Sequence, residues 1–359
     1  MDLDCALPEC AFAWAAPKKD AFGEAWPVGS DQEKMKGALI CEGRRFVCWG
    51  LTADLEYLAN DIGLPHFNSL EPCWFDAASR REDTIYPITD MRQNSAWKAT
   101  LISFEEGIDS PFTDHPIQHL VGFTRFHICG DLMHTGCLGV VQTMIGSVLW
   151  ELTFDGPFVG SQDRRVEQIW ALIQKHYALL NTPTRLGNLS IAHFTSKDAW
   201  NSLRAKAAQS QHLLFCLPYV LREVHDGSPH HEHRLRAVIA LVRIYKAFKD
   251  NPIVLPGDVA DGAMENLQSL YDHWRWLTRR SMERGELNWA IKQKLHTLYH
   301  IVDHAKYLNP RCTWCYEYED HMNSVVLAAK ACMAGSPMHI VGSKVIQNAL
   351  LVIALSLPK

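Results

Sequence analysis

Two stretches of the sequence combine residue types that bind metal ions or transfer protons. In CGDLMHTGCLGVV, Asp131 and His134 stand three residues apart where a long apolar helix is predicted to begin. In KLHTLYHIVDH, His296, His300 and His304 recur every four residues, so a helix places all three on one face. Such a face can supply two ligands to a metal site completed from elsewhere. Taken alone, such a ladder is more often an amphipathic helix with surface histidines.

Asp131 and His134 allow three interpretations: a metal site, a proton relay or a helix cap. An aspartate at the start of a helix accepts backbone N–H groups and is favourable against the helix dipole. Of the three interpretations, we favour the structural one.

The composition indicates a globular protein with reduced thiols. The chain has 359 residues, of which 47% are hydrophobic, enough for one large core or two modest ones. Its eleven cysteines are odd in number and irregularly spaced, which favours free thiols or metal ligands over a disulfide framework. The apolar run Ala349 to Leu357 is about half of what a bilayer span requires. We therefore expect an intracellular protein without membrane association.

Charge is unevenly distributed along the chain. The net charge is −5, but residues 1–120 hold ten Lys/Arg against twenty Asp/Glu, and the remainder holds twenty-five against twenty. A polyanionic partner should therefore meet the second part. Charge alone neither proves nor excludes DNA binding.

The elements that must position these residues are mostly helices. Residues 46–51 read as a buried strand, after which Thr52 is expected to cap a short helix, and residues 64–124 read as loop-rich. The stretch 225–234, HDGSPHHEHR, reads as a solvated loop. Apolar residues at three- and four-residue spacing predict helices in the segments 138–152, 164–180, 196–217, 234–248 and 263–285. A tail helix should end at Asn309-Pro310, with another from about Glu317 to Gly335.

Five short motifs, taken in order, resemble a known family. GLTADLEYL, EPCWFD, CGDLMHTGCLGVV, KLHTLYH and CYEYEDHMNSVVLAAK look like the catalytic region of eukaryotic cut-and-paste transposases. That broad group includes the CACTA-like and hAT-like elements and the transposase-related V(D)J recombinase. The likeness spans residues 45–340 and depends on the joint order of the motifs.

The resemblance implies two metal sites. Asp54 and Glu319 match the second and third acidic positions that hold Mg²⁺ or Mn²⁺ for DNA strand cleavage and transfer. Cys73 matches the first residue of a Cys-x-x-Cys pair, with Asp76 in place of the second cysteine. Together with His296 and His300 these softer ligands suit a structural Zn²⁺. Asp131 and His134 match the motif that opens the helical insertion of these enzymes.

The resemblance also implies a fold, an α/β RNase H-like core interrupted by a large all-α insertion and predominantly helical overall. Residues 1–130 would form the front part of the core, 131–290 the insertion, and 291–359 the helices that return to the core. Only fifty-three residues precede Asp54, and no aspartate among them lies in a convincing strand, so the core is expected to be incomplete.

Three functions follow as hypotheses. The first is a truncated or decayed transposase-like protein, nuclear if it acts on DNA. The second is a non-catalytic nucleic-acid or protein interaction module, because Arg236, Arg243 and Lys246 share a helical spacing, as do Arg275 and Arg279. That stripe is also typical of a solvated helix face. The third is a helical metal-binding protein unrelated to transposases.

Overall fold

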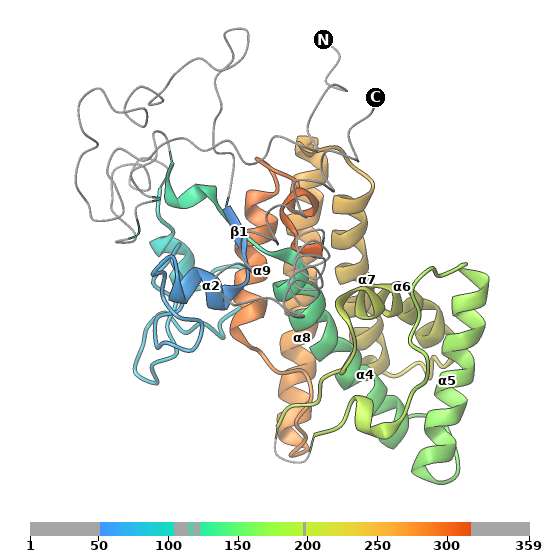
Figure 1. The fold of residues 1–359 in the computed structure, drawn as a ribbon. Coiled ribbons are helices and arrows are strands. Elements are labelled where there is room, and N and C mark those ends of the chain that lie inside the picture. Colours follow the sequence, from blue (N-terminus) through green and yellow to red (C-terminus); the bar gives the residue numbers. More distant parts are fainter. Residues whose placement is uncertain (1–50, 104–114, 116, 118–122, 197–198, 317–359) are drawn as a thin grey trace, which may run out of the picture. The chain divides into compact units, whose positions relative to one another are not determined.

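The computed structural model describes residues 51–103, 115, 117, 123–196 and 199–316. The chain divides into two compact units, Met1–Thr313 and Trp314–Lys359, and the architecture below is that of the first unit. Its described part is predominantly helical, as predicted, with one two-stranded sheet (Figure 1).

The sheet pairs two short strands that lie far apart in sequence. Strand β1 (Leu51–Ala53) runs parallel to β2 (Ile128–Gly130), with Leu51 opposite Ile128. Parallel strands require a long crossover connection and occur almost only in α/β arrangements. Of the predicted strand 46–51, only Leu51 lies within the described residues.

Helix α2 (Leu55–Asn60) follows β1 directly, and Asp54 caps it. The Asp54 Oδ1 atom accepts a hydrogen bond of 2.7 Å from the Tyr57 N–H, which satisfies a donor in the first helical turn. The prediction that Thr52 caps this helix is wrong, because Thr52 lies within β1 and its hydroxyl donates to the Thr313 carbonyl at 2.5 Å. Asp54 caps the helix instead of Thr52 because Asp54 is the last residue with an extended backbone before the helix.

We call residues 51–103 the front segment. Beyond α2 its described helical structure is the 3₁₀ turn η1 (Ala96–Thr100), in agreement with the predicted loop-rich stretch. A second 3₁₀ turn, η3 (Arg125–His127), precedes β2. One apolar cluster joins the segment to β2, and its buried members are Leu58, Ile62, Leu64, Trp74, Phe75, Phe123 and Ile128.

We call residues 133–283 the helical region. It begins with a π-helix, η4 (Met133–Val141), which continues as α4 (Gln142–Phe154). It goes on through α5 (Gln162–Leu179), the 3₁₀ turn η5 (Ile191–His193), α6 (Ala207–Glu223), α7 (Pro229–Lys249) and α8 (Gly257–Glu283) (Figure 1). Helices α7 and α8 pack closely against each other. Apolar side chains at helical spacing build this core.

The stretch Met133–Phe154 has the length and apolar composition of a membrane-crossing helix, with a hydropathy of 1.4. However, 78% of its most apolar window is buried inside the protein, which is also how a core helix behaves.

A charged residue lies at the centre of the helical region. Glu151 of α4 is fully buried and accepts a 2.6 Å hydrogen bond from the Trp289 indole. Arg234 and His230 of α7 lie 3.3 and 3.1 Å from its two carboxylate oxygens. The prediction of a solvated loop through 225–234 is therefore wrong from Pro229 onward, where α7 begins. Ser228 caps that helix, and Arg234 is buried against Glu151.

Helix α9 (Gln293–His304) returns the chain to the front segment and is followed by the 3₁₀ turn η6 (Pro310–Thr313). It packs on β2 and on η4. A Cβ atom on Gly130 would lie 2.7 Å from Ile301 Cγ1, so the missing side chain allows strand and helix to approach this closely. This approach places the histidines of α9 beside the front segment.

Candidate metal centre

Four side chains from two distant parts of the chain meet in one cluster. Cys73 and Asp76 come from the front segment, and His296 and His300 come from α9. One ligand atom of each residue lies within 4.8 Å of those of the other three. The structure thus brings together all four residues assigned to this site by the resemblance.

The distances within the cluster fit a tetrahedron of ligands. His300 Nε2 lies 3.3 Å from Cys73 Sγ and 3.2 Å from His296 Nε2. Asp76 Oδ2 lies 3.1 Å from the Nε2 atoms of both histidines. Metal bonds of about 2.0–2.3 Å in tetrahedral geometry separate the ligands by about 3.3–3.8 Å. The observed separations of 3.1–3.3 Å are at or slightly below this range, and an ion at the centre would move the ligand atoms slightly apart.

Hydrogen bonds alone cannot satisfy these atoms. His300 Nε2 faces a sulfur, a nitrogen and an oxygen, yet a ring nitrogen carries at most one proton. Asp76 Oδ2 is buried and has no hydrogen bond of acceptable geometry. Because a buried, unsatisfied carboxylate oxygen is costly, this convergence of lone pairs indicates a site for a cation.

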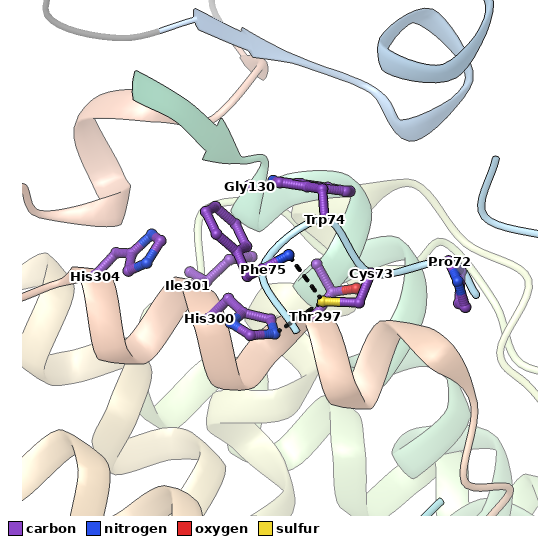
Figure 2. A pocket seen from close by; sticks show the side chains of 9 residues that line it. All are labelled: Pro72, Cys73, Trp74, Phe75, Gly130, Thr297, His300, Ile301 and His304. Carbon is purple, nitrogen blue, oxygen red and sulfur yellow. Dashed lines mark hydrogen bonds between the residues drawn. The ribbon is translucent and has the colours of Figure 1, made fainter. Parts of the chain in front are cut away.

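Local structure aims the front-segment ligands. The Phe75 N–H donates to Cys73 Sγ at 3.4 Å, as drawn in Figure 2, and the Ala78 N–H donates to Asp76 Oδ1 at 2.8 Å. The second bond leaves Asp76 Oδ2 free for the centre of the cluster. Trp74 and Phe75, between the two ligands, are buried in the apolar cluster of the front segment. Packing of these rings therefore turns Cys73 and Asp76 inward.

Helix α9 holds its two histidines on the face that meets this loop. One turn earlier, Gln293 donates to the Pro72 carbonyl at 3.4 Å and accepts from Arg80 at 3.3 Å. The Trp97 ring packs edge-on against His296 with centroids 4.5 Å apart. These surroundings exclude water and strengthen electrostatic interactions at the site.

The four groups change one another's pKa values. Burial would raise the pKa of the Cys73 thiol, but His300 and His296 outweigh it and lower the pKa to about 7. Burial would likewise raise the pKa of Asp76, yet the two rings hold it well below its usual range. Burial opposes protonation of His300, but Cys73 and Asp76 raise its pKa to about 10. Protonated histidine rings thus balance the negative charges of the Cys73 thiolate and the Asp76 carboxylate. A divalent ion would supply this positive charge instead.

His304 shares the helix face but is not a member of the cluster. Its ring packs edge-on against Phe75 at 4.7 Å between centroids, and burial lowers its pKa to about 4. Figure 2 shows Cys73 facing His300, with His304 farther along the helix. Of the three histidines in the ladder, this one has a packing role.

Asp131 and His134 form a helix start. The two carboxylate oxygens of Asp131 accept the N–H groups of Met133 and His134 at 3.0 and 2.9 Å, and Oδ2 also contacts the His134 ring. Burial would raise the pKa of Asp131, but the hydrogen bond from His134 outweighs it and lowers the pKa. The two backbone hydrogen bonds are those of a capping aspartate. The metal-site and proton-relay interpretations of this pair stay predictions.

The two residues assigned to catalysis are not brought together by any described feature. Asp54 is partly exposed and its carboxylate caps α2. Glu319 lies outside the described residues, so its predicted approach to Asp54 stays a prediction.

Sequence reasoning missed the residues that support the site. Phe75, Trp97 and Gln293 pack against or tether the ligands, but none carries a metal-binding signature. The only local signal was the pair of bulky rings between Cys73 and Asp76.

Comparison with known proteins adds no relative. No protein-family model matches the chain, and neither a curated protein nor a solved structure with significant similarity was found.

Proposed function

We propose that this chain is a transposase-derived protein in which a zinc ion, held by Cys73, Asp76, His296 and His300, fastens the front segment to α9. The observation that carries the proposal is the convergence of these four ligand atoms within 4.8 Å. A structural role fits, because four protein ligands leave no open position for a substrate.

The donor set favours zinc over other divalent ions. One thiolate, two imidazoles and one carboxylate are borderline-soft ligands that suit Zn²⁺ in tetrahedral geometry, whereas Mg²⁺ and Ca²⁺ prefer oxygen alone. The side chains of Asp76 and His296 are 0% and 1% exposed, and that of His300 is 5% exposed, whereas Cys73 is half-buried, so three of the four ligands are shielded from solvent. Because the unfolded chain has no such site, the binding energy would become folding energy.

The transposase origin is supported by topology. Asp54 directly follows β1, a strand in a parallel pair, as an RNase H-like core requires of its second acidic residue. A long helical region separates β2 from α9, in the order expected of a helical insertion. Asp54 and Glu319 would hold Mg²⁺ or Mn²⁺, which stabilises the attacking and leaving oxygens in phosphodiester cleavage. With the first acidic residue unidentified, we propose that this chemistry is lost.

A DNA-binding helical surface has weaker support. Arg236 is paired with Glu232 at 2.5 Å, and Arg275 lies 3.9 Å from Asp272. Both arginines therefore take part in solvent-exposed ion pairs within their own helices. Nuclear localisation and DNA as a partner therefore depend on the transposase origin alone.

Metal analysis of the purified chain tests the zinc proposal. We expect about one equivalent of zinc in the parent protein and much less in Cys73→Ser and His300→Ala, because three ligands bind zinc more weakly than four. His304→Gln is the matched control, since it lies one turn farther on the same face and should retain the metal. Equal zinc content in His300→Ala and the parent would disprove the site.

A nicking assay tests the transposase chemistry separately. With Mg²⁺ or Mn²⁺ and a supercoiled DNA substrate, we expect no cleavage above that of Asp54→Asn and Glu319→Gln. Metal-dependent nicking by the parent that both variants abolish would show that the catalytic site is active. It would leave the zinc proposal untouched.

A further inference from the structure

A cavity borders the beginning of α9, where the helix meets η4 and α4. A cavity of about 140 Å³ opens there, far larger than the roughly 10–15 Å³ that one water molecule needs. Its polar lining comes from Thr143, Ser202, Lys292 and Lys294. None of the described residues that line it is acidic.

The two lysines contradict the usual charge pattern of a helix. Lys292 is the N-cap residue of α9 and Lys294 lies in its first turn, with no acidic residue there and no capping side chain. The N-terminus of a helix carries partial positive charge, so cations are unfavourable and anions favourable at this end. Lys292 has no compensating partner for its side chain in the described part of the chain, and a local rule broken in this way suggests a functional site.

Several hydrogen-bond donors at the cavity are available to a ligand. Lys294 Nζ donates to the carbonyls of His134 and Leu138 at 2.8 and 3.4 Å, which leaves one of its three N–H groups. The ammonium group of Lys292 makes no hydrogen bond or ion pair with the described residues. Thr143 is only 4% exposed, lines the cavity, and has a hydroxyl without a hydrogen-bond partner in the described part of the chain.

We propose that this cavity binds the phosphate group of a small molecule. Two ammonium groups, a helix N-terminus and two hydroxyls form a donor set that matches a tetrahedral oxyanion. Trp274, Leu138 and Leu295 add apolar walls, so a phosphate monoester with an apolar part fits better than inorganic phosphate. The site does not depend on the zinc proposal, because none of the four zinc ligands lines the cavity.

The electrostatics of Lys294 are consistent with an anionic ligand. Burial lowers the pKa of this amine, and the nearby Asp131 carboxylate only partly opposes the effect. A phosphate in the cavity would add negative charge and favour the ammonium form.

Calorimetric titration of the full chain, as purified, tests the proposal. Inorganic phosphate and phenyl phosphate are titrated at constant ionic strength against a chloride blank. We expect saturable binding, tighter for phenyl phosphate. Lys292→Gln should weaken it about 10-fold or more and Thr143→Val about 2–10-fold, as a charged and a neutral hydrogen bond are lost. Lys306→Gln, an exposed lysine beyond α9, is the control and should bind like the parent.

Three outcomes would overturn the proposal. The first is that neither phosphate compound binds above the chloride blank. The second is that Lys292→Gln and Thr143→Val both bind as tightly as Lys306→Gln. The third uses a short DNA duplex: Lys292-dependent duplex binding without phenyl phosphate binding would make the surface one for nucleic acid instead. Because Lys292 is exposed and Thr143→Val keeps the side-chain volume, both variants should remain folded.

Discussion

Between Leu64 and Leu101 the described chain forms one short 3₁₀ turn, whereas between Met133 and Glu283 five α-helices and a π-helix follow one another. The front segment contributes to one small apolar cluster, and it supplies Cys73 and Asp76 to the group of side chains that could hold a metal ion. The helical region buries long apolar faces together with a paired charge at Glu151. Helices that bury a face stabilise themselves by packing, while a loop-rich segment pays conformational entropy with few contacts in return. The front segment therefore needs an additional interaction that fastens it to the rest of the fold.

Removal of the metal should have the largest effect and should separate the two regions. With a strong chelator, we expect amides of residues 73–76 and 96–100 to lose protection from hydrogen exchange, by more than about 5 kcal/mol if zinc supplies much of the local stability. Amides in α7 and α8 should keep their protection. Zinc added back should restore the parent pattern. Unchanged exchange in the front segment after chelation would show that packing alone holds it.

Breaking the buried ion pair should act on the helical region instead. Arg234→Met leaves the Glu151 carboxylate buried without its cationic partner, and we expect a loss of about 3–5 kcal/mol in unfolding free energy. The double variant Glu151→Leu/Arg234→Met should recover at least half of that loss, because no charge then remains buried. Urea denaturation followed by circular dichroism measures both values. Equal unfolding free energies of the single variant and the parent would mean that the Glu151–Arg234 pair does not stabilise the fold.

Acid should weaken the helical region through His231. Burial, together with Arg234, lowers the pKa of this histidine to about 4, against about 6.5 in the unfolded chain. Between these values the unfolded state binds more protons, so stability falls as the pH drops from 6.5 to 4. His231→Gln should remove about 2 kcal/mol of that decline. Urea midpoints at pH 7, 6, 5 and 4 test this, and parallel pH curves for parent and variant would contradict it.

The smallest effect is expected from Asp76→Cys, which sharpens the metal comparison. A second thiolate should hold zinc against stronger competing chelators, because sulfur suits zinc better than carboxylate oxygen does. Stability in the presence of zinc should change by no more than about 1 kcal/mol, since the Ala78 N–H loses its acceptor. Competition with a colorimetric chelator measures retention. Faster zinc loss from the variant would show that the site is built for the aspartate.

Local patterns were enough to predict much of the helical region. Apolar spacing marked α5, α7 and α8, and the four-residue spacing of the histidines marked the face of α9. Helix starts were harder, because Asp54 and Thr52 both have capping side chains and only the backbone conformation selects between them. The stretch after His225 looked like a loop because its histidines are polar, yet tertiary packing buries His231 in a helix.

The sequence by itself determined that Cys73 and Asp76 stand three apart and that His296, His300 and His304 share a face, because spacing and helical periodicity are local properties. Only the tertiary structure decided that the two pairs meet and that His304 is excluded. The meeting depends on the burial of Trp74 and on the close approach of Gly130 to α9. Such contacts join residues more than two hundred positions apart, and no local propensity encodes them.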